Sequence, residues 1–311
     1  MAELCRLCLG PTEDGAEHPA CLRRLFGRPQ RPPIEVDPAN LHWFGQEMAG
    51  RASVSGVQRK VSLGWSHKHL RVVAGRSSYL LKPAESAYPS LPENEHLSMK
   101  LAELAGFEAP PCGLVPLRDG NLAYLVKRFD RRGHGRRLAM EDFCQLAGLP
   151  PAEKYQGSAE QCLKLVRRHS TAPGVDAALL FRLFLFAWWI GNGDLHRKNL
   201  ALLCPDAQTA RLAPVYDLVN TAILIPEDSL ALTVRSKRSR LDRADWRSFG
   251  ADGGLPEKLV AKELDRLPAL LDAALAFVQA SFLPGRLRAA YAEQLRARST
   301  VLEAREAGEE G

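Results

Sequence analysis

The sequence predicts an α+β protein with two lobes, a strand-rich first lobe followed by a helix-rich second lobe. Runs of β-forming residues dominate up to about residue 127, and helical patterns dominate from about residue 140. A chain of 311 residues is long enough to bury one large core or two smaller ones. We therefore expect one lobe over 1–126 and a second over 127–311, with a ligand cleft between them.

The first lobe is predicted to contain a loop, several strands and one helix. "SVSGVQRKVSLGW" is a small-residue loop that leads into a strand, and "HLRVVAGRSSYLLKP" is typical of a hairpin that turns at Gly75. "NEHLSMKLAELAG" has apolar residues on one helical face, and Gly106 is placed to end that helix. "NLAYLVKRFDR" predicts a further strand that runs into a linker.

The second lobe is predicted to be mainly helical. The helical segments are "EDFCQLAGL", "SAEQCLKLVRRH", the apolar run at 177–190, and several more from 255 to the end. The apolar segment "AALLFRLFLFAWWIG" is too short to span a bilayer and carries Arg182, so we expect a buried core helix.

Composition and charge narrow the class of protein. Hydrophobic residues make up 46% of the chain and charged residues 25%, as in ordinary globular proteins. A net charge of +6 is too small to imply nucleic-acid binding, and we expect no direct contact with nucleic acid or membrane. Seven cysteines, with no pattern of a secretory signal at the N-terminus, predict reduced thiols and a cytoplasmic location.

Three of these cysteines and a histidine lie close together in "CRLCLGPTEDGAEHPAC", namely Cys5, Cys8, His18 and Cys21. A C-x-x-C pair followed by a histidine and a third cysteine has the residue types of a zinc knuckle. The alternative is a loop-rich N-terminus with small buried thiols, and the irregular spacing of the second pair favours this alternative.

Four polar residues follow the apolar run directly, in "GNGDLHRKN": Asp194, His196, Lys198 and Asn199. Asp194 and Asn199 are five residues apart, the spacing of the proton-accepting carboxylate and the metal-binding amide in the D-x-x-x-x-N loop of kinases. The alternative is a solvated turn that caps the preceding helix. So many polar residues after a buried helix favour catalysis.

A second carboxylate, Asp217, lies further along the chain. The intervening "LALLCPDAQTARLAPVY" is typical of a hairpin that turns near Pro205 and Asp206 and would return Asp217 to the side of the Asp194 segment. Kinases hold Mg²⁺ with an aspartate at that place. For Asp217 taken alone, a helix N-cap or a turn is an equally good interpretation.

Lys82, at the end of the strand in "YLLKPA", matches the strand lysine that contacts the phosphates of ATP. An exposed lysine at a strand end is the alternative, but Glu95, at the head of the next helix, is well placed to hold it. Gly56 in "SVSGVQ" would let backbone N–H groups approach phosphates, although a simple turn explains it equally well. "VKRFDRR" is expected at the junction of the lobes, where a surface salt-bridge cluster is the alternative.

Seven segments together resemble the HipA family of bacterial serine/threonine kinase toxins, in the order in which that family carries them. They are "SVSGVQRK", "YLLKP", "ENEHLSMKLAELAG", "VKRFDRR", "MEDFCQLAGLPPAEKY", "IGNGDLHRKNLAL" and "APVYDLVN". The resemblance implies a protein-kinase-like fold, with ATP and Mg²⁺ as cofactors.

By this resemblance Asp194 is the catalytic base, and Asn199 and Asp217 bind Mg²⁺. It also implies that the "VSGVQ" loop covers the ATP phosphates. Autophosphorylation of a serine in that loop, Ser53 or Ser55, would inactivate the enzyme by forcing the loop out. The residues expected to bind the nucleotide are Lys82, Gly56, Val57, Gln58, Glu95, Phe129, His196 and Lys198.

The resemblance also implies partners. Longer members carry an additional N-terminal subdomain, so this chain resembles the short HipT branch, in which a separate small antitoxin protein supplies that part. A DNA-binding antitoxin is a further expected partner, and the family's targets make an aminoacyl-tRNA synthetase the expected substrate. Two positions depart from the family: Lys127 stands where some members have an acidic residue, and Arg59 replaces an acidic residue after the glutamine.

Two other functions are compatible with parts of the sequence. "GDLHRKN" also resembles the loop of aminoglycoside phosphotransferases, which transfer phosphate to a small alcohol, but that family does not explain "SVSGVQRK" or "MEDFCQ". A catalytically silent kinase-like binding module is the second alternative. The presence of Asp194, Asn199, Asp217 and Lys82 argues against it.

Overall fold

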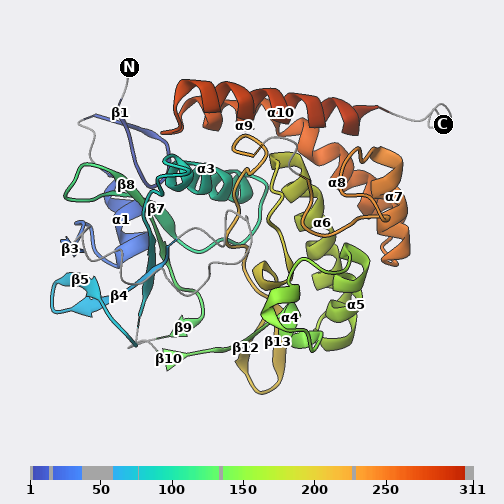
Figure 1. Cartoon of the computed structure of the whole chain (residues 1–311), viewed down its shortest axis with the longest axis horizontal. Helices are drawn as coiled ribbons and strands as arrows, with labels where there is room; N and C mark the ends of the chain where they lie inside the picture. The colour runs from blue at the N-terminus through green and yellow to red at the C-terminus, as the bar shows by residue number, and fades with distance from the viewer. Residues whose placement is uncertain are drawn as a thin grey trace.

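The computed structural model describes residues 3–13, 17–36, 59–75, 77–132, 136–225 and 229–304. These residues form an α+β structure with a strand-rich part and a helix-rich part (Figure 1). The strands are β1 (Glu3–Leu4), β2 (Pro11–Thr12), β3 (Ile34–Glu35), β4 (Val61–Ser66), β5 (His69–Val72), β6 (Tyr79–Lys82), β7 (Cys112–Pro116), β8 (Leu122–Lys127), β9 (Arg131–Arg132), β10 (Arg136–Arg137), β11 (Ala139–Asp142), β12 (Ala201–Asp206) and β13 (Thr209–Leu212). The helices are α1 (Pro19–Phe26), α3 (Leu91–Leu104), α4 (Phe143–Leu146), α5 (Ala159–His169), α6 (Pro173–Ile190), α7 (Arg243–Asp252), α8 (Glu257–Ala269), α9 (Leu271–Gln279) and α10 (Gly285–Glu303), with 3₁₀ turns η3 (Pro151–Glu153) and η4 (Arg197–Asn199).

The largest sheet has six strands in the order β3-β5-β4-β6-β8-β7. β4 lies between β5 and β6, with Leu63 opposite Val72 on one side and opposite Tyr79 on the other. The predicted direct hairpin through Gly75 is therefore wrong. The tight turn at His67, which has a φ of 53°, joins β4 to β5, and the chain then crosses to the other edge of β4.

The two faces of this sheet have different covers. Alternate residues of β8, such as Ala123 and Leu125, pack with apolar side chains of the N-terminal segment that contains α1. On this face the Tyr79 hydroxyl donates a hydrogen bond to the Leu25 carbonyl (2.9 Å). The other face packs against α3, which is buried at every position from Asn94 to Ala102. The sequence predicted that α3 buries one apolar face. More of the helix is buried than predicted, because α9 also packs against it.

The helix-rich part is built around α6, which is the predicted buried core helix. The helix has 18 residues, more than the apolar segment quoted from the sequence, so the prediction that it is too short to span a bilayer was wrong by length and composition; 67% of it, however, is buried inside the protein. α10 runs along one side of the molecule and contacts α6, α8 and α9 (Figure 1). The predicted hairpin is present as β12 and β13, extended by β11 at its edge. Helix α7 was not predicted; it begins at the Asp242 capping box.

Candidate active site

A cleft of about 260 Å³ lies between the six-stranded sheet and the helix-rich part. Leu80, Val126 and Met140 contribute apolar wall, together with the rings of Phe129 and Tyr216, whose centroids are 5.5 Å apart. Charged side chains line the rest of the wall. The cleft therefore offers an apolar surface suited to a flat ring next to a polar surface suited to charged groups.

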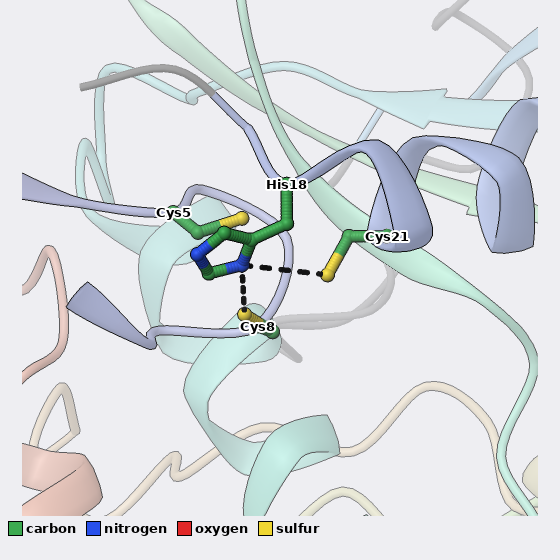
Figure 2. Close-up of side chains that lie close together, drawn as sticks. All are labelled: Cys5, Cys8, His18 and Cys21. Carbon is green, nitrogen blue, oxygen red and sulfur yellow. Dashed lines mark hydrogen bonds between the residues drawn. The ribbon is translucent and has the colours of Figure 1, made fainter. Parts of the chain in front are cut away.

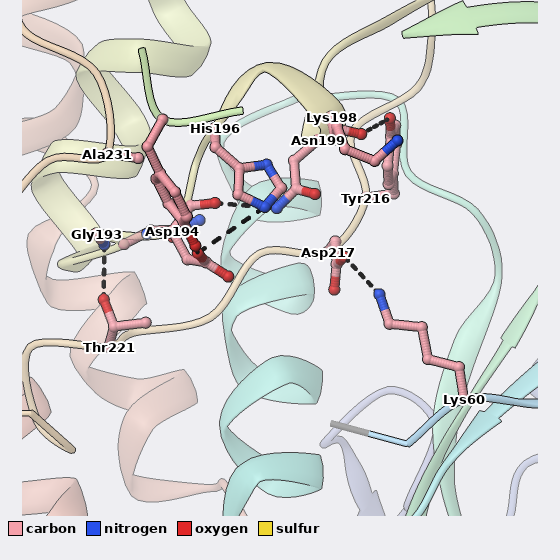
Figure 3. Close-up of polar contacts among 12 residues, drawn as sticks. Lys60, Gly193, Asp194, His196, Lys198, Asn199, Tyr216, Asp217, Thr221 and Ala231 are labelled. Atoms are coloured by element: carbon pink, nitrogen blue, oxygen red, sulfur yellow. Dashed lines mark hydrogen bonds and ion pairs between the residues drawn. The ribbon is translucent and has the colours of Figure 1, made fainter. Parts of the chain in front are cut away.

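Lys82 is the centre of the charged region. It is the last residue of β6, and its side chain is only 4% exposed. Its Nζ atom lies 2.5 Å from Glu95 Oε1, in the second turn of α3, and 2.5 Å from Asp217 Oδ1. Lys60 Nζ binds the other oxygen of Asp217 at 3.0 Å (Figure 3). The strand, the helix and the loop after β13 thus bring two lysines and two carboxylates together.

The charges in this cluster stabilise one another. Burial alone lowers the pKa of Lys82, but Asp217 and Glu95 reverse the effect and hold it above its usual value. Burial raises the pKa of Asp217, and Lys60 and Lys82 outweigh burial and hold it well below its usual value. Burial also raises the pKa of Glu95, with Lys82 opposing that shift. Lys82 and Asp217 are therefore a charged pair at neutral pH.

Asp217 adopts an unusual backbone conformation, with a φ of 59°. Few residues other than glycine adopt it, although aspartate tolerates it better than most. The chain after Asp217 is held against α3 by a reciprocal pair of hydrogen bonds: the Asn220 N–H donates to Asn94 Oδ1 (2.8 Å), and Asn94 Nδ2 donates to the Asn220 carbonyl (2.8 Å). This fixed chain direction supports the conformation of Asp217.

The segment after α6, residues 191–199, is hereafter the Asp194 loop. Gly191 ends α6 with a φ of 80°, a conformation that favours glycine, and a Cβ there would lie 2.6 Å from Asn220 Oδ1. Asn192 Oδ1 accepts a hydrogen bond from the Asp194 N–H (2.8 Å), and Asn199 Nδ2 donates to the Asp194 carbonyl (3.0 Å). The loop is therefore folded tightly around Asp194.

The carboxylate of Asp194 has its own polar surroundings. The Tyr155 hydroxyl donates to Asp194 Oδ1 (2.5 Å), and His196 Nε2 lies 4.0 Å from the same oxygen (Figure 3). Burial lowers the pKa of His196 to about 4, with Asp194 opposing the shift, so this imidazole is neutral at neutral pH. Asp194 is buried and does not line the described part of the cleft, whereas His196 does.

The Asp194 loop and the chain after Asp217 are bonded to each other. The Gly193 N–H donates to Thr221 Oγ1 (2.6 Å), and the Thr221 N–H donates to the Gly191 carbonyl (3.0 Å) (Figure 3). Two loops that are separate in the sequence therefore hold Asp194 and Asp217 in a fixed relation.

The donor set fits a hard cation such as Mg²⁺, which prefers carboxylate and amide oxygens. Because the Asn199 amide nitrogen is bonded to the Asp194 carbonyl, its amide oxygen is the atom available for a metal, and Asn199 and Asp217 both line the cleft. Each oxygen of Asp217 accepts a hydrogen bond from a lysine and keeps a second lone pair with which it could bind a cation.

The remaining predicted residues fall into two groups. Phe129, His196 and Lys198 line the cleft, as expected of nucleotide-binding residues, and Lys198 Nζ also pairs with Asp142 (2.9 Å). Those in the predicted phosphate-covering loop lie outside the described residues: Ser53, Ser55, Gly56, Val57 and Gln58.

The charged residues of "VKRFDRR" lie at the expected junction of the lobes, where Arg128 and Asp130 line the cleft; they are ion-paired, but Asp130 is buried, so the cluster is not the surface cluster of the alternative interpretation. Asp130 lies 2.6 Å from Arg128 and 2.5 Å from Arg131. Arg59, one of the departures from the family, pairs with Glu85 at 2.9 Å. The other departure, Lys127, lines the cleft.

Sequence reasoning missed five residues that organise the site. A signal for all five was available, because four of them lie inside a quoted motif and the fifth, Thr221, directly follows one. Tyr155 ends "MEDFCQLAGLPPAEKY", and Asn220 ends "APVYDLVN". The partnerships themselves join distant parts of the chain, so spacing could not reveal them. The five are Lys60, Asn94, Tyr155, Asn220 and Thr221.

Comparison with known proteins assigns the family. Residues 52–274 match the HipA-like C-terminal domain. The chain belongs to this family. It is 32% identical to Y4mE of Sinorhizobium fredii over 231 residues, which cover 70% of this chain and 54% of that protein. It is 29% identical over 270 residues to the serine/threonine-protein kinase toxin HipA of Shewanella oneidensis, covering 76% of this chain and 58% of the toxin. The chain thus matches little more than half the length of these relatives.

Solved structures with the same fold include HipA of Shewanella oneidensis MR-1, in a complex with HipB and operator DNA. It matches this HipA-like chain with a TM-score of 0.70 and 24% identity, over 84% of this chain and 70% of that one. The proinflammatory kinase CtkA of Helicobacter pylori matches with a TM-score of 0.59 and 14% identity, over 88% of this chain and 96% of CtkA. The predicted kinase-like α+β fold is therefore confirmed.

Proposed function

We propose that this HipA-like chain is an ATP-dependent serine/threonine protein kinase that acts as the toxin of a bacterial toxin–antitoxin system. One observation carries the proposal. The ion-paired cluster of Lys82, Glu95 and Asp217 lines the same cleft as Asn199, and the Asp194 loop is hydrogen-bonded to the chain after Asp217. A strand lysine held by a helix glutamate, a D-x-x-x-x-N loop and a second aspartate are the parts that phosphoryl transfer from ATP requires.

Each residue has a distinct role in this proposal. Lys82, oriented by Glu95, contacts the phosphates, and the apolar wall near Phe129 accepts the base. Asn199 and Asp217 hold Mg²⁺, which neutralises phosphate charge when it is bound. Asp194 accepts the proton of the acceptor hydroxyl. His196, which is neutral at neutral pH, places no positive charge beside Asp194.

The kinase activity is tested with purified protein, radiolabelled ATP and Mg²⁺. We expect transfer to protein serine or threonine in the wild type and none in Asp194→Ala. Asp206→Ala is the matched control, because Asp206 lies at the exposed turn of the β12–β13 hairpin, away from the cleft, and should leave transfer unchanged. Equal labelling in the wild type and in Asp194→Ala would contradict the proposal.

The same assay separates a protein kinase from a small-molecule phosphotransferase. An aminoglycoside or another small alcohol is added in excess over the protein. We expect the label to stay on protein; its appearance on the small alcohol would favour the alternative. Absence of ATP binding by calorimetry would favour a catalytically silent binding module.

Autophosphorylation, target and partners are finer parts of the proposal. We propose that Ser53 or Ser55 is the autophosphorylated residue and that an aminoacyl-tRNA synthetase is the substrate. Mass spectrometry of phosphopeptides from bacteria that express the wild type or Asp194→Ala tests both points. Phosphate at either serine and on a synthetase should be present only with the wild type.

We also propose that the chain works with a separate antitoxin, as the presence of HipB in the complex of Shewanella HipA suggests for a relative. Such an antitoxin should co-purify with the tagged chain and restore growth on co-expression. We place the activity in the cytoplasm; the seven cysteines are all free thiols, which is compatible with a reducing compartment.

A further inference from the structure

Three cysteines and one histidine converge near the N-terminus, close to α3, whose residue His96 has its Nε2 atom 3.4 Å from the Leu7 carbonyl (Figure 2). Cys5 and Cys8 come from the turn between β1 and β2, whereas His18 and Cys21 come from the start of α1. The four candidate ligand atoms, one from each side chain, all lie within 4.8 Å of one another. The kinase proposal uses none of them.

Their spacing is close to that of a tetrahedral metal site. His18 Nδ1 lies 3.3 Å from Cys8 Sγ and 3.9 Å from Cys21 Sγ. Zinc bonds of about 2.3 Å to sulfur and 2.0–2.1 Å to nitrogen place tetrahedral ligand atoms about 3.5–3.8 Å apart. Small side-chain rotations are enough to bring all four atoms to that distance.

The histidine is oriented as a metal ligand. His18 Nε2 lies 3.0 Å from the Pro11 carbonyl, and that oxygen can only accept, so Nε2 carries the proton. Nδ1 is then the nitrogen with a lone pair, and Figure 2 shows it facing the sulfurs of Cys8 and Cys21. A hydrogen bond from the second ring nitrogen to a carbonyl is the usual way in which a metal-bound histidine is held.

Backbone hydrogen bonds also fix the conformation of the turn that carries Cys5 and Cys8. The Cys5 N–H donates to the Gly10 carbonyl (2.8 Å), and the Leu9 N–H donates to the Cys5 carbonyl (2.9 Å). Leu9 takes the left-handed conformation, with a φ of 66°, to close this turn. The Gly10 N–H then points at Cys8 Sγ (3.4 Å), a contact that stabilises a thiolate.

We propose that Cys5, Cys8, His18 and Cys21 bind one structural Zn²⁺ ion. Soft thiolates with an imidazole in tetrahedral array select Zn²⁺ over Mg²⁺ or Ca²⁺. Four protein ligands fill the coordination shell, so the ion has no open position for a substrate. The irregular spacing that argued against zinc in the sequence falls between β2 and α1, and the four ligand atoms converge in spite of it.

The ion would join the β1–β2 turn to α1, and both pack on the six-stranded sheet that contains β6, the strand that ends at Lys82. Cys5 and Leu7 belong to the same apolar cluster as Leu25 and Leu81. The Leu114 N–H of β7 donates to the Arg6 carbonyl, between the two cysteines of the turn (2.9 Å). Loss of zinc should therefore loosen the cover of this sheet face.

The test is metal analysis of the full chain, purified without chelator. We expect about one zinc per chain in the wild type, and at least about tenfold less in Cys8→Ser and Cys21→Ser after dialysis. Cys204→Ser is the matched control: it removes a partly buried thiol of β12 and should keep the zinc. Full zinc content in Cys8→Ser, or iron in place of zinc, would overturn the proposal.

A second measurement needs no variant and covers the case in which Cys8→Ser fails to fold. The wild type is stripped with chelator and refilled with Co²⁺, which should give the absorption bands of tetrahedral thiolate-bound cobalt. Zn²⁺ should raise the melting temperature of the stripped protein and displace the cobalt. Absence of these bands, or a disulfide among Cys5, Cys8 and Cys21 in freshly purified protein, would overturn the proposal.

Discussion

The Asp194 loop and the segment that carries Asp217 meet at the same cleft, but different contacts hold them. Around Asp194 the backbone bonds are local, from residues two and five positions away. Asp217 is held by Lys60 and Lys82, which are 157 and 135 positions away in the sequence. One aspartate is therefore placed by a short folded loop and the other by the tertiary structure.

The largest effect on folding should come from a change at Asp217, which is held by long-range contacts. Asp217→Asn removes the charge that faces Lys60 and Lys82, and it should lower the free energy of unfolding by about 3 kcal/mol at neutral pH. Asp252→Asn is the control, because Asp252 and its partner Arg235 are both exposed; it should change stability by less than about 1 kcal/mol. Chemical denaturation measures both.

The same pair predicts a pH dependence. The folded-state pKa of Asp217 lies below its ordinary value of 3.8, so its contribution to stability is complete above that pH and is lost as the pH falls below it. The difference between wild type and Asp217→Asn should therefore shrink in acid. A difference that stays constant from neutral pH to acid would show that charge is not the cause.

A smaller effect should follow when the bond between α3 and the Asp217 segment is removed. Asn94→Leu leaves the buried N–H and carbonyl of Asn220 without their partner and should destabilise the protein by about 2 kcal/mol. Asn121→Ala, at an exposed turn, should cost less than about 0.5 kcal/mol. Equal melting temperatures for the two variants would show that the Asn94 pair does not hold the loop.

The smallest expected effect comes from a change in the surroundings of Asp194. Tyr155→Phe removes only one group, the hydroxyl that donates to Asp194. We expect kcat for phosphoryl transfer to fall about tenfold while KM for ATP stays the same, because in the proposed function Asp194 serves the acceptor and not the nucleotide. Steady-state kinetics measure this split, and a rise in KM alone would place Tyr155 on the nucleotide side.

The difference between local contacts at Asp194 and long-range contacts at Asp217 explains which parts of the site could be predicted from the sequence. The Asp194 loop was recognised because its residues are close in sequence and follow an apolar helix that is visible as such. Asp217 alone was ambiguous, because Lys60 and Lys82 become its neighbours only after the tertiary structure has formed. The hairpin at Gly75 was mispredicted for the same reason: both β5 and β6 look like strands, but β4 decides their pairing.

The cysteine cluster gives the same lesson. Residue types indicated a zinc site and spacing argued against it, and only the fold shows that the histidine turns Nδ1 toward the sulfurs. The predicted phosphate-covering loop, with Ser53 and Ser55, lies outside the described residues, so its role stays a prediction.

The central claim is that Asp194 serves the acceptor and Asp217 serves the metal-bound nucleotide. Titration of ATP into Asp194→Ala and Asp217→Ala, each with and without Mg²⁺, tests it most directly. We expect Asp194→Ala to bind Mg·ATP as the wild type does, although it transfers no phosphate. Asp217→Ala should lose at least about tenfold in affinity, and only in the presence of Mg²⁺, because it lacks one of the few protein oxygens that hold the ion. Identical titration curves for the two variants would contradict this division of roles.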